Sequence, residues 1–255
     1  PAPVSAVLSA LVVKAAVYLI MRLWLDLFSP ALSPASAWLL GLLGSAAVLW
    51  GSWNALKAQR LKLLAAYSTV AQLGYLFIFF PLLAALPAGP ARETAFGALV
   101  LMALTHAFAK SALFLAAGVI QQNARHDRIE ELGGTARALP VTIFTLALAG
   151  VALIGLPPSG AFLAKWQLLS SAFATGQWLW VPVVAAGSLM AAGYVFRVLG
   201  FAFGPGDGAM QKLADGREEL PALLLAIVAT AVLGLGASAV WDFVAPGALL
   251  MEAQR

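Results

Sequence analysis

The chain of 255 residues contains no cysteine and only two histidines, His106 and His126. Without thiolates, it can form neither an iron–sulfur cluster, nor a thiolate metal site, nor a disulfide. A bis-histidine haem is not expected, because His106 lies in an apolar stretch and His126 in a polar connection. A P-loop and a dinucleotide fingerprint are also missing. We therefore expect no cofactor or metal in this chain, and any associated redox chemistry or nucleotide hydrolysis must occur on another subunit.

Charge is also scarce, since 10% of the residues are charged and 62% are hydrophobic. Soluble domains carry about 25% charged residues, so this sequence predicts an integral membrane protein in a lipid bilayer. The apolar stretches cover residues 4–25, 37–56, 63–86, 94–121, 139–172, 178–203 and 220–245. At about 20 residues per crossing, they predict an all-α fold of about seven transmembrane helices. The basic residues are scattered over loops, so nucleic acid is not an expected partner.

Lysine and arginine are unevenly divided between the two sets of connections. One set holds Lys57, Arg60, Lys62, Arg125, Arg128, Arg137, Lys212 and Arg217. The other set holds Arg22, Arg92 and Arg255. The positive-inside rule places the richer set in the cytoplasm. We therefore expect a multi-pass protein of the cytoplasmic (inner) membrane with a cytoplasmic N-terminus and an external C-terminus.

The stretch 139–172 is interrupted by Gly155-Leu-Pro-Pro-Ser-Gly160. The two prolines remove backbone donors, and the glycines allow unusual dihedral angles. Lipid cannot satisfy the freed carbonyls, and discontinuous helices in transporters mark places where ions or water pass. A simple proline kink is the alternative. Because Lys165 follows five residues after the interruption, we favour a functional break.

Lysines at the depth of the membrane are the main candidates for a functional site. Lys14 lies at the midpoint of an otherwise uncharged apolar run, Val4–Leu25. A lysine at the centre of a membrane helix costs about 2.5–3.5 kcal/mol on insertion scales. Snorkelling is the alternative, but the headgroups are too distant for the side chain to reach easily. Lys14 is therefore predicted to act in a proton relay.

His106 and Lys110 are four residues apart, so they lie on the same face of one helix. If both were charged they would repel each other, so one proton could pass between them through a water molecule. The alternative is a core histidine that bonds to a nearby hydroxyl such as that of Thr105. We interpret the pair as part of the same relay.

Lys165 is also assigned to the relay, with snorkelling to the external side as the alternative. Snorkelling is the favoured interpretation of Arg197, because arginine keeps its proton and would be a poor carrier. The polar run Tyr67–Gln72 could hydrate a half-channel or bond neighbouring helices, and the sequence leaves both open. Trp24, Trp38, Trp178, Trp180 and Trp241 lie near segment ends and are interpreted as interfacial anchors.

These motifs resemble the antiporter-like subunits of respiratory complex I, of Mrp-type cation/proton antiporters and of membrane-bound hydrogenases. The resemblance is carried by Val13-Lys14-Ala-Ala-Val-Tyr18, by Lys62-Leu-Leu-Ala-Ala-Tyr67-Ser-Thr-Val-Ala-Gln72-Leu-Gly-Tyr75, by Thr105-His106-Ala-Phe-Ala-Lys110-Ser-Ala-Leu-Phe-Leu-Ala-Ala-Gly118 and by Gly155-Leu-Pro-Pro-Ser-Gly-Ala-Phe-Leu-Ala-Lys165. They follow the family's order over residues 1 to about 200.

The resemblance implies a fold of fourteen helices that contains two inverted five-helix repeats. This chain is similar to helices eight to fourteen of that fold. It implies a single transmembrane domain over residues 1–255, with 1–25 ending the first repeat, 37–203 forming the second and 220–245 a peripheral helix. In the family's roles, Lys14 would be the central relay, His106 and Lys110 the second half-channel and Lys165 the exit. The implied function is a proton-translocating subunit of an NADH-quinone oxidoreductase-type or Mrp-type assembly.

Two departures from the family qualify that implication. The chain begins Pro1-Ala-Pro-Val4 without the first repeat, so we expect a fragment, or a split gene whose companion polypeptide supplies the N-terminal half. All eleven acidic residues lie in loops or near segment ends, as Asp242 does, so a counter-ion for Lys14 is expected from that companion. A structural scaffold that conducts nothing and a sodium/proton antiporter subunit remain as alternatives.

Overall fold

The computed structural model describes residues 1–27, 33–206 and 219–252. Those residues form helices, and no strand occurs among them. The elements are α1 (Ala2–Val7), η1 (Leu8–Val12), α2 (Val13–Arg22), η2 (Leu23–Leu27), α3 (Pro34–Lys57), α4 (Leu61–Ala85), α5 (Pro90–Ala124), η3 (Ile129–Glu131), α6 (Thr135–Ala138), α7 (Pro140–Ile154), α8 (Gly160–Ala174), α9 (Trp180–Phe203), α10 (Glu219–Ile227), η4 (Val228–Val232), α11 (Leu233–Leu235) and α12 (Ala237–Glu252). Here η3 is a 3₁₀ turn, whereas η1, η2 and η4 are π-helical.

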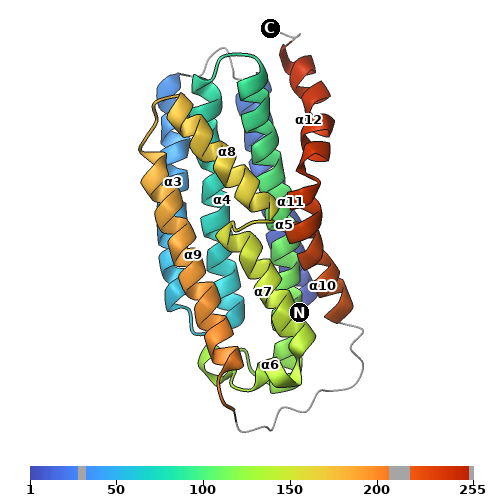
Figure 1. Cartoon of the computed structure of the whole chain (residues 1–255). Coiled ribbons are helices and arrows are strands. Elements are labelled where there is room, and N and C mark those ends of the chain that lie inside the picture. The colour runs from blue at the N-terminus through green and yellow to red at the C-terminus, as the bar shows by residue number, and fades with distance from the viewer. Residues whose placement is uncertain (28–32, 207–218, 253–255) are drawn as a thin grey trace.

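Five helices in the described part are long and apolar enough to cross a membrane, or six if one bent pair counts as a span. The five are Ala2–Arg22, Pro34–Lys57, Leu61–Ala85, Pro90–Ala124 and Trp180–Phe203. Helix α7 is too short to cross alone, but α7 and α8 lie end to end along the bundle (Figure 1). The all-helical membrane fold, broken between α7 and α8, is therefore as predicted.

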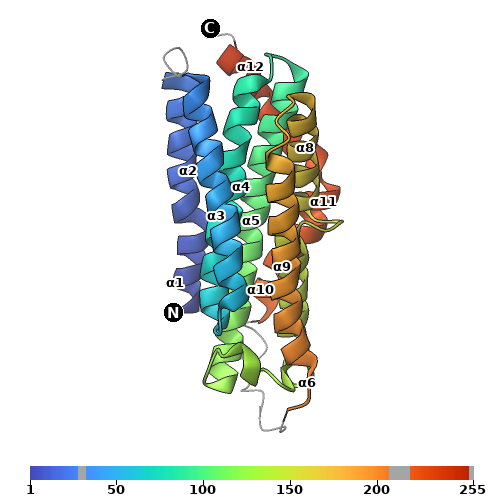
Figure 2. The ribbon, with the colours of Figure 1, turned by 90° about the vertical axis from the view of Figure 1, so that its left-hand side faces the viewer.

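The helices run side by side in one elongated bundle, with α1 and α2 at its edge (Figure 2). The N-terminus lies toward the end that carries α6 and the α3–α4 connection, whereas α12 runs to the opposite end (Figures 1 and 2). Arg60, Arg128 and Arg137 belong to connections at the α6 end. The described connections therefore alternate between the two ends of the bundle, as the division into two sets of connections requires.

A non-helical segment, residues 155–159, separates α7 from α8. Helix α7 ends at Ile154 and is followed by Gly155, whose φ of +83° lies in the left-handed region, where glycine carries no steric penalty. Helix α8 begins after Ser159, whose hydroxyl accepts a hydrogen bond from the Phe162 amide at 3.2 Å. Because one helix ends and another is capped anew, the proline-kink interpretation is wrong.

A second break was not predicted. The stretch 220–245 was expected to be one helix, but Glu219–Leu235 and Ala237–Val244 meet at 73° around Gly236. Neighbouring Gly234 lies directly against the carbonyl of Pro158, where an added Cβ could not fit. The bend in the last span therefore contacts the turn between α7 and α8.

Helices α3 and α4 approach each other closely through glycines. A Cβ on Gly44 would lie 2.5 Å from the carbonyl oxygen of Gly74, and one on Gly51 would lie 2.7 Å from the amide nitrogen of Ala71. Both obstacles are backbone atoms. Small residues at membrane helix interfaces allow such approaches, which supply van der Waals contact where lipid provides no hydrophobic driving force.

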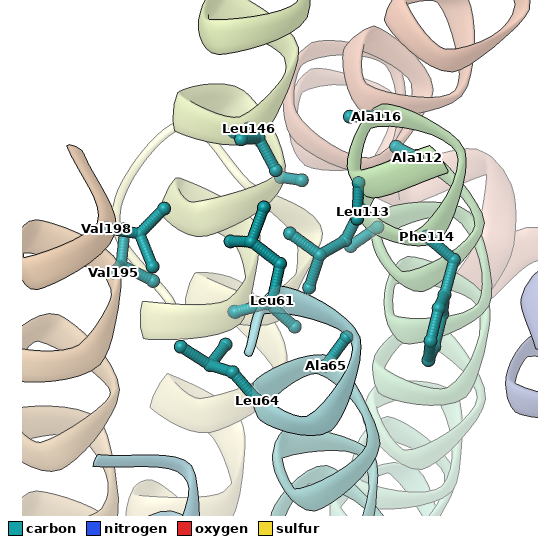
Figure 3. Close-up of a cluster of buried hydrophobic side chains, with 14 of the residues drawn as sticks. Leu61, Leu64, Ala65, Ala112, Leu113, Phe114, Ala116, Leu146, Val195 and Val198 are labelled. Atoms are coloured by element: carbon teal, nitrogen blue, oxygen red, sulfur yellow. The ribbon is translucent and has the colours of Figure 1, made fainter. Parts of the chain in front are cut away.

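An apolar cluster fills the bundle toward the α6 end (Figure 3). Leu61 and Leu64 of α4 meet Leu113 of α5, and Val195 and Val198 of α9 face them from the other side. They line an apolar cavity of about 20 Å³, room for roughly one water molecule. Ala65 belongs to this cluster, and its carbonyl is one of the polar groups described next.

Trp180 corrects one expectation. It is fully buried, and its indole N–H donates to the side-chain oxygen of Gln177 at 2.7 Å. Gln177 in turn donates to the carbonyl of Pro81 at 3.0 Å. The interpretation of Trp180 as an interfacial anchor is therefore wrong, because its position near a segment end does not reveal which way the ring points.

Candidate functional site

Lys110 lies at the centre of a buried polar site. Its side chain is fully inaccessible, and its Nζ donates to the carbonyl of Ala65 at 3.0 Å and to the hydroxyl of Ser68. Both acceptors belong to α4, which packs against α5. Within the described ranges, these are the hydrogen-bond acceptors of the amine, and neither is a carboxylate. The amine is thus held by neutral oxygens.

A pair of hydroxyls joins this site to the N-terminal helix. Ser9 Oγ and Thr69 Oγ1 are 2.7 Å apart. Because the Thr69 hydroxyl donates to the Ala65 carbonyl at 2.9 Å, the Ser9 hydroxyl must donate to Thr69. Lys110 donates to that same carbonyl. The Ala65 carbonyl oxygen therefore accepts hydrogen bonds from both Thr69 and Lys110.

Lys14 approaches the site from the edge of the bundle. It is partly buried, and its Nζ donates to the backbone carbonyl of Ser9. The π-helical turn η1 makes this possible, because the Val13 amide bonds to Leu8 instead of taking the Ser9 carbonyl. The predicted central lysine therefore lies next to the Ser9–Thr69 pair and remains partly exposed at the edge of the bundle.

His106 is buried, at 2% exposure, one turn from Lys110. Neither ring nitrogen has a hydrogen-bond partner among the described residues, and nor does the hydroxyl of neighbouring Thr105. The alternative of a core histidine bonded to Thr105 is therefore wrong. Buried polar atoms are rarely left unpaired, so these atoms are where ordered water is expected.

Lys165 turns inward to the break. It is 5% exposed, and its Nζ donates to the carbonyl of Ile154 at 2.9 Å and to the hydroxyl of Ser188 at 2.9 Å. The same nitrogen lies 4.4 Å from the centre of the Tyr75 ring. Ile154 is the last residue of α7, so the amine caps a carbonyl that the break leaves without a helical partner. The snorkelling alternative for Lys165 is wrong.

Polar groups also lie between Lys110 and Lys165. Gln72 donates to the carbonyl of Leu153 at 2.8 Å, next to the carbonyl that Lys165 caps. The Tyr194 hydroxyl lies near Ser68 and Gln72, and the Tyr75 hydroxyl lies near Ser188. The polar run Tyr67–Gln72 therefore bonds neighbouring helices through Ser68, Thr69 and Gln72. The sequence indicated no role for Ser9, Tyr75, Tyr194 and Ser188, because single polar residues in apolar helices carry no pattern.

Arg197 lies outside this line of groups. Its guanidinium donates to the carbonyls of Leu56 and Ala58, at 2.7 and 3.0 Å, and lies 3.6 Å from the Glu130 carboxylate. The side chain thus reaches the end of the bundle, as the snorkelling interpretation predicts. In the described part of the chain, no group of three or more His, Cys, Asp or Glu residues could hold a metal ion.

Comparison with known proteins identifies the family. Residues 1–191 match the family described as "NADH:quinone oxidoreductase/Mrp antiporter, TM". The chain belongs to this family. Its relatives include NADH-quinone oxidoreductase subunit N of Desulforudis audaxviator, 35% identical over 247 residues, which are 92% of this chain and 47% of the relative. A Na(+)/H(+) antiporter protein of Alkalihalophilus pseudofirmus is 39% identical over 175 residues, which are 65% of this chain and 21% of the relative.

A solved structure extends the likeness to three dimensions. A chain of the membrane-bound sulfane sulfur reductase, an archaeal respiratory membrane complex, is 25% identical with a TM-score of 0.83, over 97% of this chain and 49% of that one. The family and the apolar helices make this chain a multi-pass membrane protein related to subunits of multi-subunit complexes. It spans less than half the length of these relatives.

Proposed function

We propose that this chain forms the second half of a proton-translocating, antiporter-like membrane subunit. The observation that carries the proposal is the line of buried polar groups from Lys14 past Lys110 to Lys165. Its lysines are held by neutral oxygens, so each amine can gain or lose a proton without breaking an ion pair. Ionisable residues inside a membrane protein commonly mark such proton relays.

In the proposed relay, a proton passes from Lys14 past Ser9 and Thr69 toward Lys110. The unpaired nitrogens of His106 offer the site for a water beside Lys110. Ser68, Tyr194 and Gln72 lead on to Lys165 at the break. Release from Lys165 completes the path, and Lys14, His106, Lys110 and Lys165 are the groups that carry the proton.

We further propose that the end bearing α6 faces the cytoplasm and that the C-terminus lies outside, in the inner membrane. The basic connections at the α6 end support this orientation. Large apolar side chains on α1, η1 and α2, among them Leu11 and Leu19, are more than half exposed. They leave Lys14 beside an uncovered face, where a companion polypeptide with the first repeat would pack. Residues 1–25 then end the first repeat and residues 37–203 form the second.

Proton flux measured with the full assembly in vesicles tests the proposal. We expect Lys14→Ala to reduce flux by about 100-fold, since positioned proton-transfer groups typically contribute 10²–10⁴-fold. Lys57→Ala is the matched control, because Lys57 lies at the surface over the ring of Trp53 and its loss should leave flux unchanged.

Two outcomes contradict the proposal. Normal flux in Lys14→Ala would favour a structural scaffold that conducts nothing through this chain. Flux that stops when sodium is withdrawn would instead favour a sodium/proton antiporter, as in the relative from Alkalihalophilus pseudofirmus. The same vesicles, prepared with and without sodium, distinguish the two.

A further inference from the structure

Lys165 is a buried amine with no carboxylate beside it in the described part of the chain. Its hydrogen bonds go to the Ile154 carbonyl and the Ser188 hydroxyl, both neutral. Its Nζ also lies over the face of the Tyr75 ring, 4.4 Å from the ring centre. Attraction between a cation and an aromatic face is strongest where water is excluded, and both side chains are at most 5% exposed. The Tyr75 ring therefore adds an attraction for the protonated amine to that of the two neutral oxygens.

The packing of α4 against α9 fixes the ring. Tyr75 is 1% exposed. Its hydroxyl end lies so close to Gly187 of α9 that a Cβ there could not fit, and Ser188 follows next in the chain. Gly187 thus admits the tyrosine, and Ser188, which accepts a hydrogen bond from Lys165, lies near the tyrosine hydroxyl. The ring and the amine are held together by one short segment of α9.

We propose that the ring of Tyr75 stabilises the protonated form of Lys165 in place of a carboxylate, and so sets the pH range in which this end of the relay releases its proton. The inference rests on the proposed function and adds a positioning residue to it. A neutral ring leaves no anion behind when the proton departs. A carboxylate partner would have to remain as an unpaired buried charge, at a high cost.

Other titratable groups on the helices around α8 do not contact this amine in the described structure. On α5, Lys110 bonds to Ala65 and Ser68, and His106 lies one turn from it. On α9, Tyr194 lies near Ser68 and Gln72, and Arg197 reaches the end of the bundle. On α4, Lys62 bonds to Gln121, and the Tyr67 ring packs against Trp50 of α3. Arg92 and Glu93 lie in the first turn of α5. The described residues of α7, η4 and α11 contain no titratable side chain.

The test varies the charge on the face of the ring while keeping its size. In the full assembly, Tyr75→Phe is compared with 3,5-difluoro- and 3,4,5-trifluorophenylalanine at position 75, and proton flux is measured against pH. Fluorine withdraws the electron density that attracts the cation. We expect the midpoint of the flux profile to move stepwise to lower pH, by about one unit in total, because the protonated amine becomes less stable.

Phe79 provides the matched control, because it is fully buried one turn further along α4 and has no cation over its ring among the described residues. The same fluorinated residues at position 79 should leave the midpoint in place. An equal midpoint for phenylalanine and trifluorophenylalanine at position 75 would overturn the inference, as would an equal shift at position 79. If Lys14→Ala stops the flux while fluorination changes nothing, only this inference fails. If Lys14→Ala leaves the flux intact, the proposed function fails.

Discussion

Lys110→Met should reduce proton flux through the assembly by about 100-fold or more, the range that positioned proton-transfer groups supply. Lys110 is fully buried, and its amine is bonded to Ala65 and Ser68 of α4. Methionine fills a similar volume without a proton to give. The Thr69 hydroxyl still donates to the Ala65 carbonyl in the variant, so we expect the fold to survive. Flux in vesicles and thermal unfolding of the purified assembly are the measurements.

Lys110→Arg separates a proton carrier from a fixed charge. Arginine keeps the positive charge but does not release its proton. If Lys110 carries protons, the arginine variant should be as inactive as the methionine variant, although both assemble. Restored flux in Lys110→Arg would show that only the charge is required. Near-normal flux in Lys110→Met would remove Lys110 from the relay altogether.

The general plan of this fold was predictable because it follows from one-dimensional signals. Length and hydropathy located the spans, since a helix needs about 20 apolar residues to cross a bilayer. The break at Gly155 was predictable because two prolines and two glycines fall within six residues. The bend at Gly236 was not, because Gly234 and Gly236 stand in an apolar run with no proline close to them, and glycines there are usually tolerated within a helix.

Within the site, the sequence located the lysines but not their partners. A lysine in an apolar helix is visible by its cost alone. Which oxygens it meets depends on how each helix is rotated and how far it is displaced along its axis. The line Lys14–Ser9–Thr69 also depends on the π-helical turn η1, which shifts the register by one residue. No periodicity in Val4–Leu25 indicates that turn.

The direction of Lys165 shows the same limit. Counting residues placed it near the external end of its helix, where snorkelling was open. The structure turns it back to Ile154, because the break exposes a carbonyl there and Gly155 leaves room for the lysine stem, whose Cδ would lie 2.8 Å from an added Cβ. Depth in a span and direction of a side chain are separate properties, and only the first can be read from the sequence.

Gly44→Val should prevent α3 from packing on α4. Any side chain at position 44 meets the carbonyl oxygen of Gly74 at 2.5 Å and Cβ of Phe77 at 2.8 Å. Backbone cannot move aside as a flexible side chain can. Overpacking typically costs about 1–3 kcal/mol, and we expect the upper end of that range or more here. Thermal unfolding in detergent, and the yield of assembled protein, measure the effect.

Gly200→Ala is the matched control, a glycine within helix α9 around which nothing lies within 4 Å of an added Cβ. Alanine favours a helix over glycine by about 0.5–1 kcal/mol, so this variant should be as stable as the unchanged protein or slightly more so. An unchanged unfolding temperature for Gly44→Val would contradict the prediction, because it would mean that α3 and α4 can separate without loss of stability.

Helix α4 carries Ser68, Thr69, Gln72 and Tyr75. A separation of α3 from α4 would therefore also displace the acceptors of Lys110 and the ring beside Lys165. Stability and proton flux should therefore fall together in Gly44→Val, whereas the lysine variants should lose flux alone.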